Sequence, residues 1–150
     1  MTVSVFCERL YGKKSQEGTL RVMSFNIRLG VANDGDNRWD LRKDLVVNTI
    51  RDYNPDLLGL QEVFPMQEEY LRENFPEYFY YGRSRLVDPK DGEACSIMFR
   101  KDRFDAIERS TFWLSKTENE PGSKSWDSSL PRIANIVRLQ DKQVKGGELV

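Results

Sequence analysis

The segment Asn54–Val63, with the sequence Asn-Pro-Asp-Leu-Leu-Gly-Leu-Gln-Glu-Val, decides the predicted fold. Pro55 fixes its own φ and disfavours helix at the residue before it, so a preceding helix ends there. The apolar run Leu57–Leu60 has the length of a strand that is buried on both faces. Open α/β sheets bind ligands at the carboxyl ends of such strands, where Glu62 is found. Because an unpaired carboxylate is costly beside a buried strand, Glu62 is the first candidate for a functional residue.

An earlier strand is predicted over Leu20–Leu29, where apolar and polar residues alternate, with the polar Asn26 near its end. Between the two strands, Trp39–Tyr53 has apolar residues at helical spacing, and Asp36 or Asn37 is the expected N-cap. Strand, helix and strand together predict a βαβ unit. The predicted apolar face of the helix consists of Leu41, Leu45, Val46, Thr49, Ile50 and Tyr53.

The rest of the chain predicts a second helix and then short β segments. The helix is expected over Pro65–Asn74, with Met66, Tyr70 and Leu71 on one face. The β segments, separated by polar loops, are Tyr78–Arg83, Cys95–Arg100, Phe104–Arg109 and Arg132–Leu139, and Glu148–Val150 begins another. Residues 1–19 are predicted to be a flexible leader, and residues 20–150 a single partial domain.

The composition excludes several classes of function. The formal net charge of −1 lacks the basic excess of a protein that coats nucleic acid. The absence of histidine excludes a Ser-His-Asp or Cys-His arrangement, and any imidazole ligand, within these residues. Cys7 and Cys95 form neither a disulfide framework nor a zinc site, which favours reduced thiols in a cytoplasmic protein. The sequence predicts no signal peptide and no membrane span.

Asn26 and Glu62 both stand at the ends of apolar strands that one helix connects. A right-handed crossover brings those two ends to the same edge of the sheet. A carboxylate and an amide oxygen together suit a hard cation such as Mg²⁺. An equally compatible interpretation is structural: Glu62 caps the following helix and Asn26 satisfies a turn.

A series of motifs runs from about Leu20 to Leu139. They are Met23–Arg28, Trp39 with Arg42, Pro55–Val63, Gly82–Arg85, Gly92-Glu93 with Ile97 and Phe99, Asp102–Phe104, Thr111–Ser115, Pro121–Asp127 and Arg132. In this order they resemble a bacterial-type branch of the endonuclease/exonuclease/phosphatase superfamily. The resemblance implies an α/β fold, the N-terminal half of a DNase I-like two-sheet α/β sandwich, whose mixed sheet begins with the βαβ unit. It also implies hydrolysis of phosphodiesters or phosphomonoesters with Mg²⁺, or alternatively Mn²⁺, as cofactor.

The resemblance also assigns roles to individual residues. Glu62 matches the metal-binding glutamate, and Asn26 matches the active-site asparagine beside it. Glu93, Asp127 and Arg132 lie in motifs of the branch and are weaker candidates for substrate binding, Arg132 because its planar fork suits phosphate. For each of these three, a salt bridge or a loop hydrogen bond is an equal alternative.

The family's second half contains an Asn-x-His strand, a Gly-Asp-Phe-Asn-like motif and a terminal Ser-Asp-His, and none of them is present here. The resemblance therefore predicts part of a phosphoester hydrolase, in a truncated or incomplete product that is essentially inactive alone. The alternative is a noncatalytic binding module that retains the half-fold. A half-sheet with an exposed edge also predicts self-association. The identity of the phosphate-ester substrate stays open.

Overall fold

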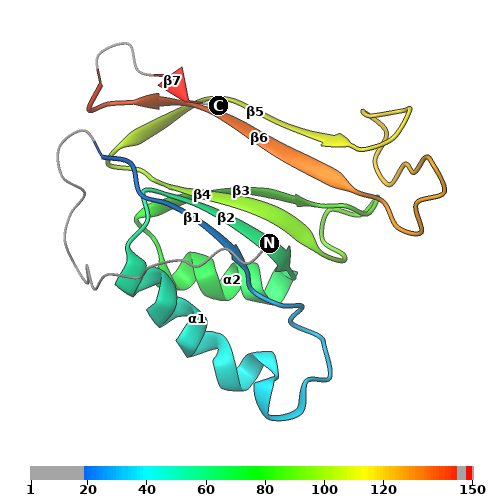
Figure 1. Cartoon of the computed structure of the whole chain (residues 1–150), viewed down its shortest axis with the longest axis horizontal. Coiled ribbons are helices and arrows are strands. Elements are labelled where there is room, and N and C mark those ends of the chain that lie inside the picture. The colour runs from blue at the N-terminus through cyan, green and yellow to red at the C-terminus, as the bar shows by residue number, and fades with distance from the viewer. Residues whose placement is uncertain (1–18, 145–147, 150) are drawn as a thin grey trace, which may run out of the picture.

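The computed structural model describes residues 19–144 and 148–149, in which two sheets and two helices form three layers (Figure 1). The elements are β1 (Val22–Asn26), a short 3₁₀ helix (Gly35–Asn37), α1 (Trp39–Tyr53), β2 (Leu57–Val63), α2 (Pro65–Asn74), β3 (Tyr78–Ser84), β4 (Ala94–Arg100), β5 (Phe104–Trp113), β6 (Ile133–Asp141) and β7 (Glu148–Leu149). Both helices cover one face of the first sheet, and the second sheet lies against its other face (Figure 1).

The first sheet is mixed and has the strand order β1-β2-β4-β3. β1 and β2 are parallel, with Asn26 opposite Gln61, whereas β4 runs antiparallel to both of its neighbours. The second sheet, β5-β6-β7, is antiparallel throughout. This arrangement confirms the predicted α/β two-sheet sandwich, whose mixed sheet begins with a βαβ unit.

Strand β2 contributes to two separate hydrophobic cores. Leu58 and Leu60 are fully buried in the core between the first sheet and the helices, together with Val46, Val47 and Leu71. On the other face of the strand, Leu57 packs against the core between the two sheets, which contains Phe99, Phe104, Val137 and Leu139. The prediction of a strand that is buried on both faces is therefore correct. The strand continues two residues beyond Leu60 to include Glu62 before it ends at Val63.

The bounds of α1 are those predicted, but its N-cap and its buried face are not. The N-cap residue is Arg38, because Asp36 and Asn37 belong to the preceding 3₁₀ helix and cannot cap α1. Leu41, Leu45 and Tyr53 are 57%, 69% and 39% exposed, so the predicted face is wrong for these three. The buried residues are Trp39, Val46, Val47 and Ile50. Leu41 lies two residues from Trp39, about 200° around the helix axis, and so points away from the sheet.

Helix α2 also has the predicted bounds and a different buried face. Leu71 is buried as expected, but Met66 is 42% exposed and Gln67 takes its place with no exposed surface. The β segments follow the prediction, with β5 extending further, to Trp113. The predicted leader lies outside the described residues except for Thr19. Within the described ranges, no helix has the length and apolar character needed to cross a membrane.

Candidate metal-binding site

The parallel pairing of β1 with β2 brings Asn26 and Glu62 into contact. The side-chain nitrogen of Asn26, Nδ2, donates to Glu62 Oε1 at 2.9 Å. The backbone N–H of Leu29, in the turn after β1, donates to Glu62 Oε2 at 2.9 Å. Each carboxylate oxygen thus receives one hydrogen bond from a neutral donor. Since a carboxylate has about four lone-pair positions, acceptor capacity remains for a ligand at this edge of the sheet.

The backbone at the site adopts conformations that residues other than glycine rarely adopt. Glu62 has φ 61° and Arg28 has φ 60°, both in the left-handed region. Glu62 lies where the register between β2 and β4 shifts, between Leu60 and Val63. Such a bulge changes the direction of a side chain and is common beside active sites. Because a left-handed residue other than glycine costs about 1–3 kcal/mol, two of them at one corner support a functional interpretation.

The structural interpretation of Glu62 as a helix cap is wrong. The N-cap of α2 is Phe64, and its N–H donates to the side chain of Gln67 at 2.9 Å rather than to Glu62. Asn26 does satisfy a turn, because its Oδ1 accepts the N–H of Arg28 at 2.8 Å. It contacts Glu62 at the same time through its nitrogen, so the two interpretations of Asn26 are not exclusive.

Neighbouring groups favour the ionised form of Glu62. The hydrogen bond from Asn26 lowers the pKa of the Glu62 carboxyl below its ordinary value, and the Leu29 N–H and the charges of Arg28 and Arg42 act in the same direction against partial burial. Arg28 itself is held by Asp34, with Nη2···Oδ1 at 2.8 Å and Nε···Oδ2 at 2.9 Å. Glu62 is therefore an anionic oxygen donor at neutral pH.

These residues fit a hard cation that retains much of its water. Mg²⁺ commonly binds to one or two carboxylates and completes its shell with water and substrate phosphate. Glu62 supplies one carboxylate, whereas Asn26 Oδ1 is already engaged by Arg28, so Asn26 orients Glu62 in this arrangement. Over residues 19–144 and 148–149, no cluster of three or more Asp, Glu, Cys or His side chains could enclose a metal ion. The donor set is that of an open site.

Glu93 lies at the same end of the first sheet as Glu62. It directly precedes Ala94, which pairs with Val63 across β2 and β4. Its carboxylate forms a two-pronged ion pair with Arg85, with Nη1···Oε2 at 3.0 Å and Nη2···Oε1 at 3.2 Å. The salt bridge that the sequence left open as an alternative is therefore present at Glu93.

Arg132 and Asp127 lie in the connection between β5 and β6. Arg132 is exposed, and its carbonyl accepts the N–H of Leu114 at 2.7 Å. Asp127 is exposed and left-handed, with φ 57°. In the described part of the chain, no hydrogen bond or ion pair joins Glu93, Asp127 or Arg132 to Asn26 or Glu62. Their roles in substrate binding stay predictions.

Two residues that support the site were missed by the sequence-based predictions. Arg42 of α1 and Gln67 of α2 donate to backbone carbonyls of the turn that follows β1. Arg42 belonged to a recognised motif without a role of its own. The signal for Gln67 was its position, because it lies one residue from Met66 and four from Leu71, on the face that α2 buries.

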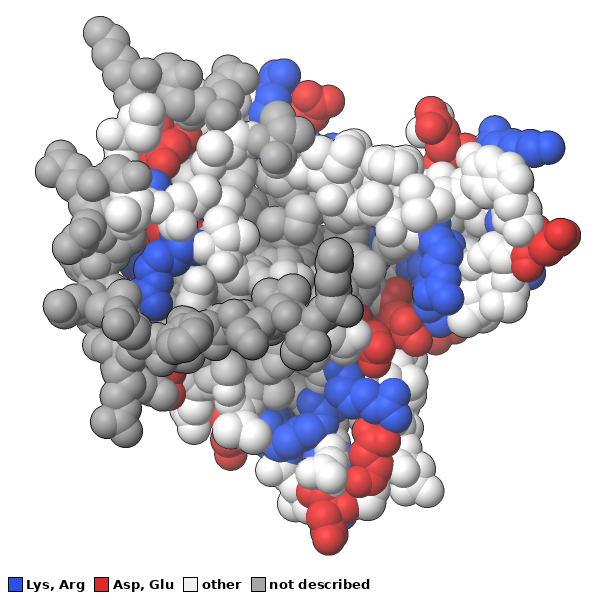
Figure 2. All heavy atoms as spheres, in the orientation of Figure 1, with Lys and Arg blue, Asp and Glu red and all other residues white. Residues whose placement is uncertain are grey.

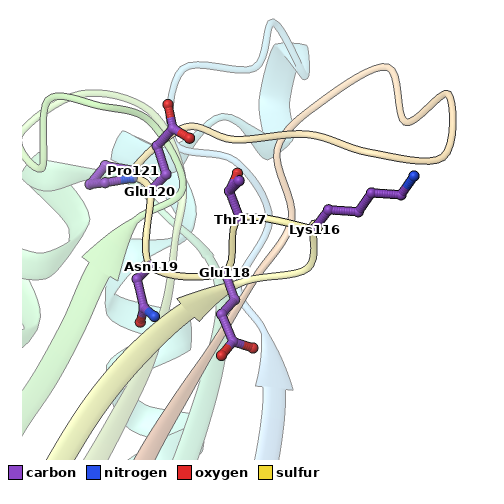
Figure 3. A pocket seen from close by; sticks show the side chains of 6 residues that line it. All are labelled: Lys116, Thr117, Glu118, Asn119, Glu120 and Pro121. Atoms are coloured by element: carbon purple, nitrogen blue, oxygen red, sulfur yellow. The ribbon is translucent and has the colours of Figure 1, made fainter.

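Neither a hollow among the described residues nor the charge on the face shown in Figure 2 gives a second candidate site. A hollow of about 660 Å³ is formed by the single loop Lys116–Pro121, whose side chains point in different directions (Figure 3). Ligand sites instead bring a few polar groups together on one point. On the face shown in Figure 2, basic and acidic side chains are intermixed.

The two-sheet sandwich and its Asn–Glu corner define a DNase I-like α/β protein. The profile of the Endonuclease/Exonuclease/phosphatase family matches residues 23–126. The chain belongs to this family, as the motifs predicted.

Solved structures and curated proteins agree with this assignment. The chain is 36% identical to an endonuclease/exonuclease/phosphatase from Bacteroides vulgatus, with a TM-score of 0.79 over 82% of this chain and 47% of that one. It is 34% identical to a mannosyl-6-phosphatase from Bacteroides thetaiotaomicron, with a TM-score of 0.77 over 83% of this chain and 47% of that one. The CCR4-Not complex 3'-5'-exoribonuclease subunit Ccr4 of Neosartorya fischeri is 26% identical over 122 residues, 70% of this chain and 16% of that protein. The chain thus spans about half of these solved structures and less than a fifth of the curated relative.

Proposed function

We propose that the chain carries the metal-binding part of a Mg²⁺-dependent phosphoester hydrolase, with Glu62 as the metal ligand. The observation that carries this proposal is the fixation of both Glu62 oxygens by neutral donors, which leaves the carboxylate charged and partly exposed. The relatives support the reaction class, because their names describe a phosphatase and an exoribonuclease. Phosphomonoesters and phosphodiesters are therefore both candidate substrates.

The residues of the chain would hold and orient the cation. Glu62 binds it through an oxygen, while Asn26 and the Leu29 N–H keep the carboxylate in one orientation. A bound Mg²⁺ or Mn²⁺ supplies Lewis-acid polarisation of a phosphoryl oxygen and neutralises charge on the leaving oxygen. The open donor set leaves room for water and for a phosphate group.

The 150-residue chain by itself is expected to be essentially inactive. It contains no histidine, and no three Asp, Glu or Cys side chains of the described residues could together enclose a metal ion. Groups that orient the attacking water act on the transition state, so their absence lowers the rate and not merely the affinity. Mg²⁺-dependent cleavage of a nitrophenyl phosphodiester or phosphomonoester by this chain, abolished in Glu62→Ala, would overturn the expected inactivity.

Calorimetric titration of Mg²⁺ and of Mn²⁺ tests the proposed ligand directly. We expect the wild-type chain to bind and Glu62→Gln to lose binding, because the amide keeps the shape of the side chain without its charge. Glu68→Gln is the matched control, since Glu68 of α2 is 30% exposed and paired with Arg72. Equal binding by wild type and Glu62→Gln contradicts the proposal.

One edge of the first sheet supports self-association, which the sequence set against a folded noncatalytic module. Among the described residues β1 is an edge strand, and Val22 in it is 55% exposed. We propose that this edge also mediates self-association, since unpaired strand edges recruit other strands. Sedimentation of the purified chain distinguishes a monomer from an assembly, and Val22→Lys is expected to shift an assembly toward monomer.

A further inference from the structure

The turn Ile27–Gly30, directly after β1, is held by side chains from both helices. Arg42 of α1 donates from Nη1 to the carbonyl of Ile27 at 2.5 Å and from Nη2 to the carbonyl of Arg28 at 2.8 Å. Gln67 of α2 donates from Nε2 to the same Arg28 carbonyl at 2.9 Å. Two successive carbonyls are therefore fixed toward the helices by three hydrogen bonds.

Gln67 has no freedom to move away from this turn. It is completely buried, and its other polar atom, Oε1, accepts the N–H of Phe64 at 2.9 Å. Gly30 lies directly against it: a Cβ at that position would be 2.7 Å from Gln67 Cδ and 2.9 Å from Cγ. An apolar residue would fill this position without burying an amide, so two hydrogen bonds together account for the glutamine: the one that caps α2 at Phe64 and the one to the Arg28 carbonyl.

The held carbonyls determine where the N–H groups of the turn point. With its carbonyl directed toward the helices, Arg28 adopts φ 60° and its N–H reaches Asn26 Oδ1 at 2.8 Å. The next N–H, that of Leu29, reaches Glu62 Oε2 at 2.9 Å. A left-handed residue of this kind persists only where its surroundings enforce the conformation. Both contacts that orient the Glu62 carboxylate thus pass through the turn.

We propose that Arg42 and Gln67 are positioning residues for Glu62: they hold the Ile27–Gly30 turn so that Asn26 and the Leu29 N–H fix both carboxylate oxygens for a cation. This inference rests on the proposed function. In the described part of the chain, no hydrogen bond joins either residue to the Glu62 carboxylate, so apart from the charge of Arg42, which lowers the Glu62 pKa, both act through the backbone. Partners that orient a metal ligand typically change metal affinity roughly 10- to 100-fold when they are removed.

Three substitutions test the proposal without altering Asn26 or Glu62. Arg42→Lys retains the charge but cannot bridge two carbonyls in the way that the guanidinium fork does. Gln67→Met keeps the size of the side chain and removes its hydrogen bonds. Gly30→Ala introduces a Cβ that collides with Gln67. We expect each to weaken Mg²⁺ binding roughly 10- to 100-fold by calorimetry, and to accelerate hydrogen exchange of the Leu29 amide, measured by NMR in the metal-free protein.

A destabilised control separates positioning from general stability. Tyr78 is buried opposite Arg100, at the other end of β4 from Ala94, and its hydroxyl donates to the Pro55 carbonyl, so Tyr78→Phe is expected to lower stability away from the site. We expect this variant to keep the Mg²⁺ affinity and the Leu29 amide exchange of the wild type, even when its unfolding midpoint equals that of the turn variants. If Gln67→Met does not fold, Arg42→Lys decides the outcome.

The outcomes for the two proposals are distinguishable. Wild-type Leu29 exchange in Arg42→Lys and Gly30→Ala, or a loss of affinity no greater than that of Tyr78→Phe, overturns the positioning role. If the wild-type chain does not bind Mg²⁺, the proposed function fails. If the Leu29 amide then exchanges faster in these three variants and not in the control, Arg42 and Gln67 still control the contacts of Glu62.

Discussion

Two glutamates at the same end of the first sheet have opposite surroundings. Glu62 receives its hydrogen bonds from neutral donors, the Asn26 amide and the Leu29 N–H. Glu93, which adjoins the next strand, gives both oxygens to the guanidinium of Arg85. A carboxylate whose charge is balanced by a bound guanidinium attracts a further cation weakly, whereas a carboxylate held by neutral donors has no ion-paired partner that competes with a cation. The comparison indicates why position alone does not define a metal ligand.

The largest expected effect is the difference in Mg²⁺ binding between substitutions at these two glutamates. Glu62→Gln should abolish Mg²⁺ binding, whereas Glu93→Gln should leave it intact, because the Glu93 charge is already balanced by Arg85. Calorimetry on the two variants under the same conditions makes the test. Loss of binding in Glu93→Gln with a normal fold would mean that both carboxylates serve the cation and that the contrast is wrong.

The pH dependence of Mg²⁺ binding at Glu62 should change when Asn26 is replaced. The folded-state pKa of Glu62 lies below its ordinary value of 4.5, first because of the hydrogen bond from Asn26. Its ionised form therefore stabilises the fold above that value, and this contribution is lost as the pH falls through the lowered pKa. Asn26→Ala should raise the pKa, so that Mg²⁺ binding is lost at a higher pH than in the wild type.

A pH series of calorimetric titrations measures this shift. Asn48→Ala, which removes an exposed asparagine of α1, is the control and should keep the wild-type profile. Identical profiles for Asn26→Ala and wild type would show that Asn26 does not control the ionisation of Glu62.

Arg85, the partner of Glu93, should contribute to the stability of the fold rather than to Mg²⁺ binding. The side chains of Arg85 and Glu93 are 15% and 26% exposed. Arg85→Met leaves the Glu93 carboxylate without its cation, and we expect a loss of about 1–2 kcal/mol, reduced from the value for a fully buried pair by solvent screening. Chemical denaturation measures the loss, and calorimetry should show unchanged Mg²⁺ binding. A large loss of Mg²⁺ affinity in Arg85→Met would mean that the Arg85–Glu93 pair also influences metal binding at Glu62.

The smallest effect is expected at the surface pair Arg72–Glu68 of α2. This pair has an i, i+4 spacing, and its side chains are 51% and 30% exposed. Glu68→Gln, which leaves the contact of Arg72 with the Tyr80 ring in place, should cost about 0.3–0.5 kcal/mol, because surface helix pairs contribute little. Denaturation under the conditions used for Arg85→Met gives the comparison, and equal losses for the two variants would mean that burial does not distinguish them.

Much of the frame of the site could be predicted from sequence. The bounds of α1 and α2 and the contact between Asn26 and Glu62 followed from hydrophobic periodicity, proline positions and the handedness of the crossover. The buried face of α1 could not be assigned, because Leu41 and Leu45 are apolar yet point away from the sheet. An apolar residue on a helix surface looks the same in sequence as one in the core.

The supporting contacts were beyond the sequence for a different reason. Arg42 reaches Ile27 across 15 positions, and Gln67 reaches Arg28 across 39. Their partners are backbone carbonyls, which every residue has, so residue types alone do not reveal the pairing. The left-handed φ of Glu62 was equally hidden, since it arises from a bulge between two strands.

The sequence by itself determined the strand–helix–strand order and the carboxylate near the end of β2, because these depend on local patterns and one rule of connection. Only the tertiary structure decided which glutamate is free of an ion pair in the described structure. Glu62 and Glu93 both lie at strand ends, but Asn26 and the Leu29 N–H reach one of them and Arg85 the other. The partners of Glu62 are 36 and 33 positions away, in segments that the packing of the helices against the sheet brings together, whereas Arg85 lies only 8 positions from Glu93.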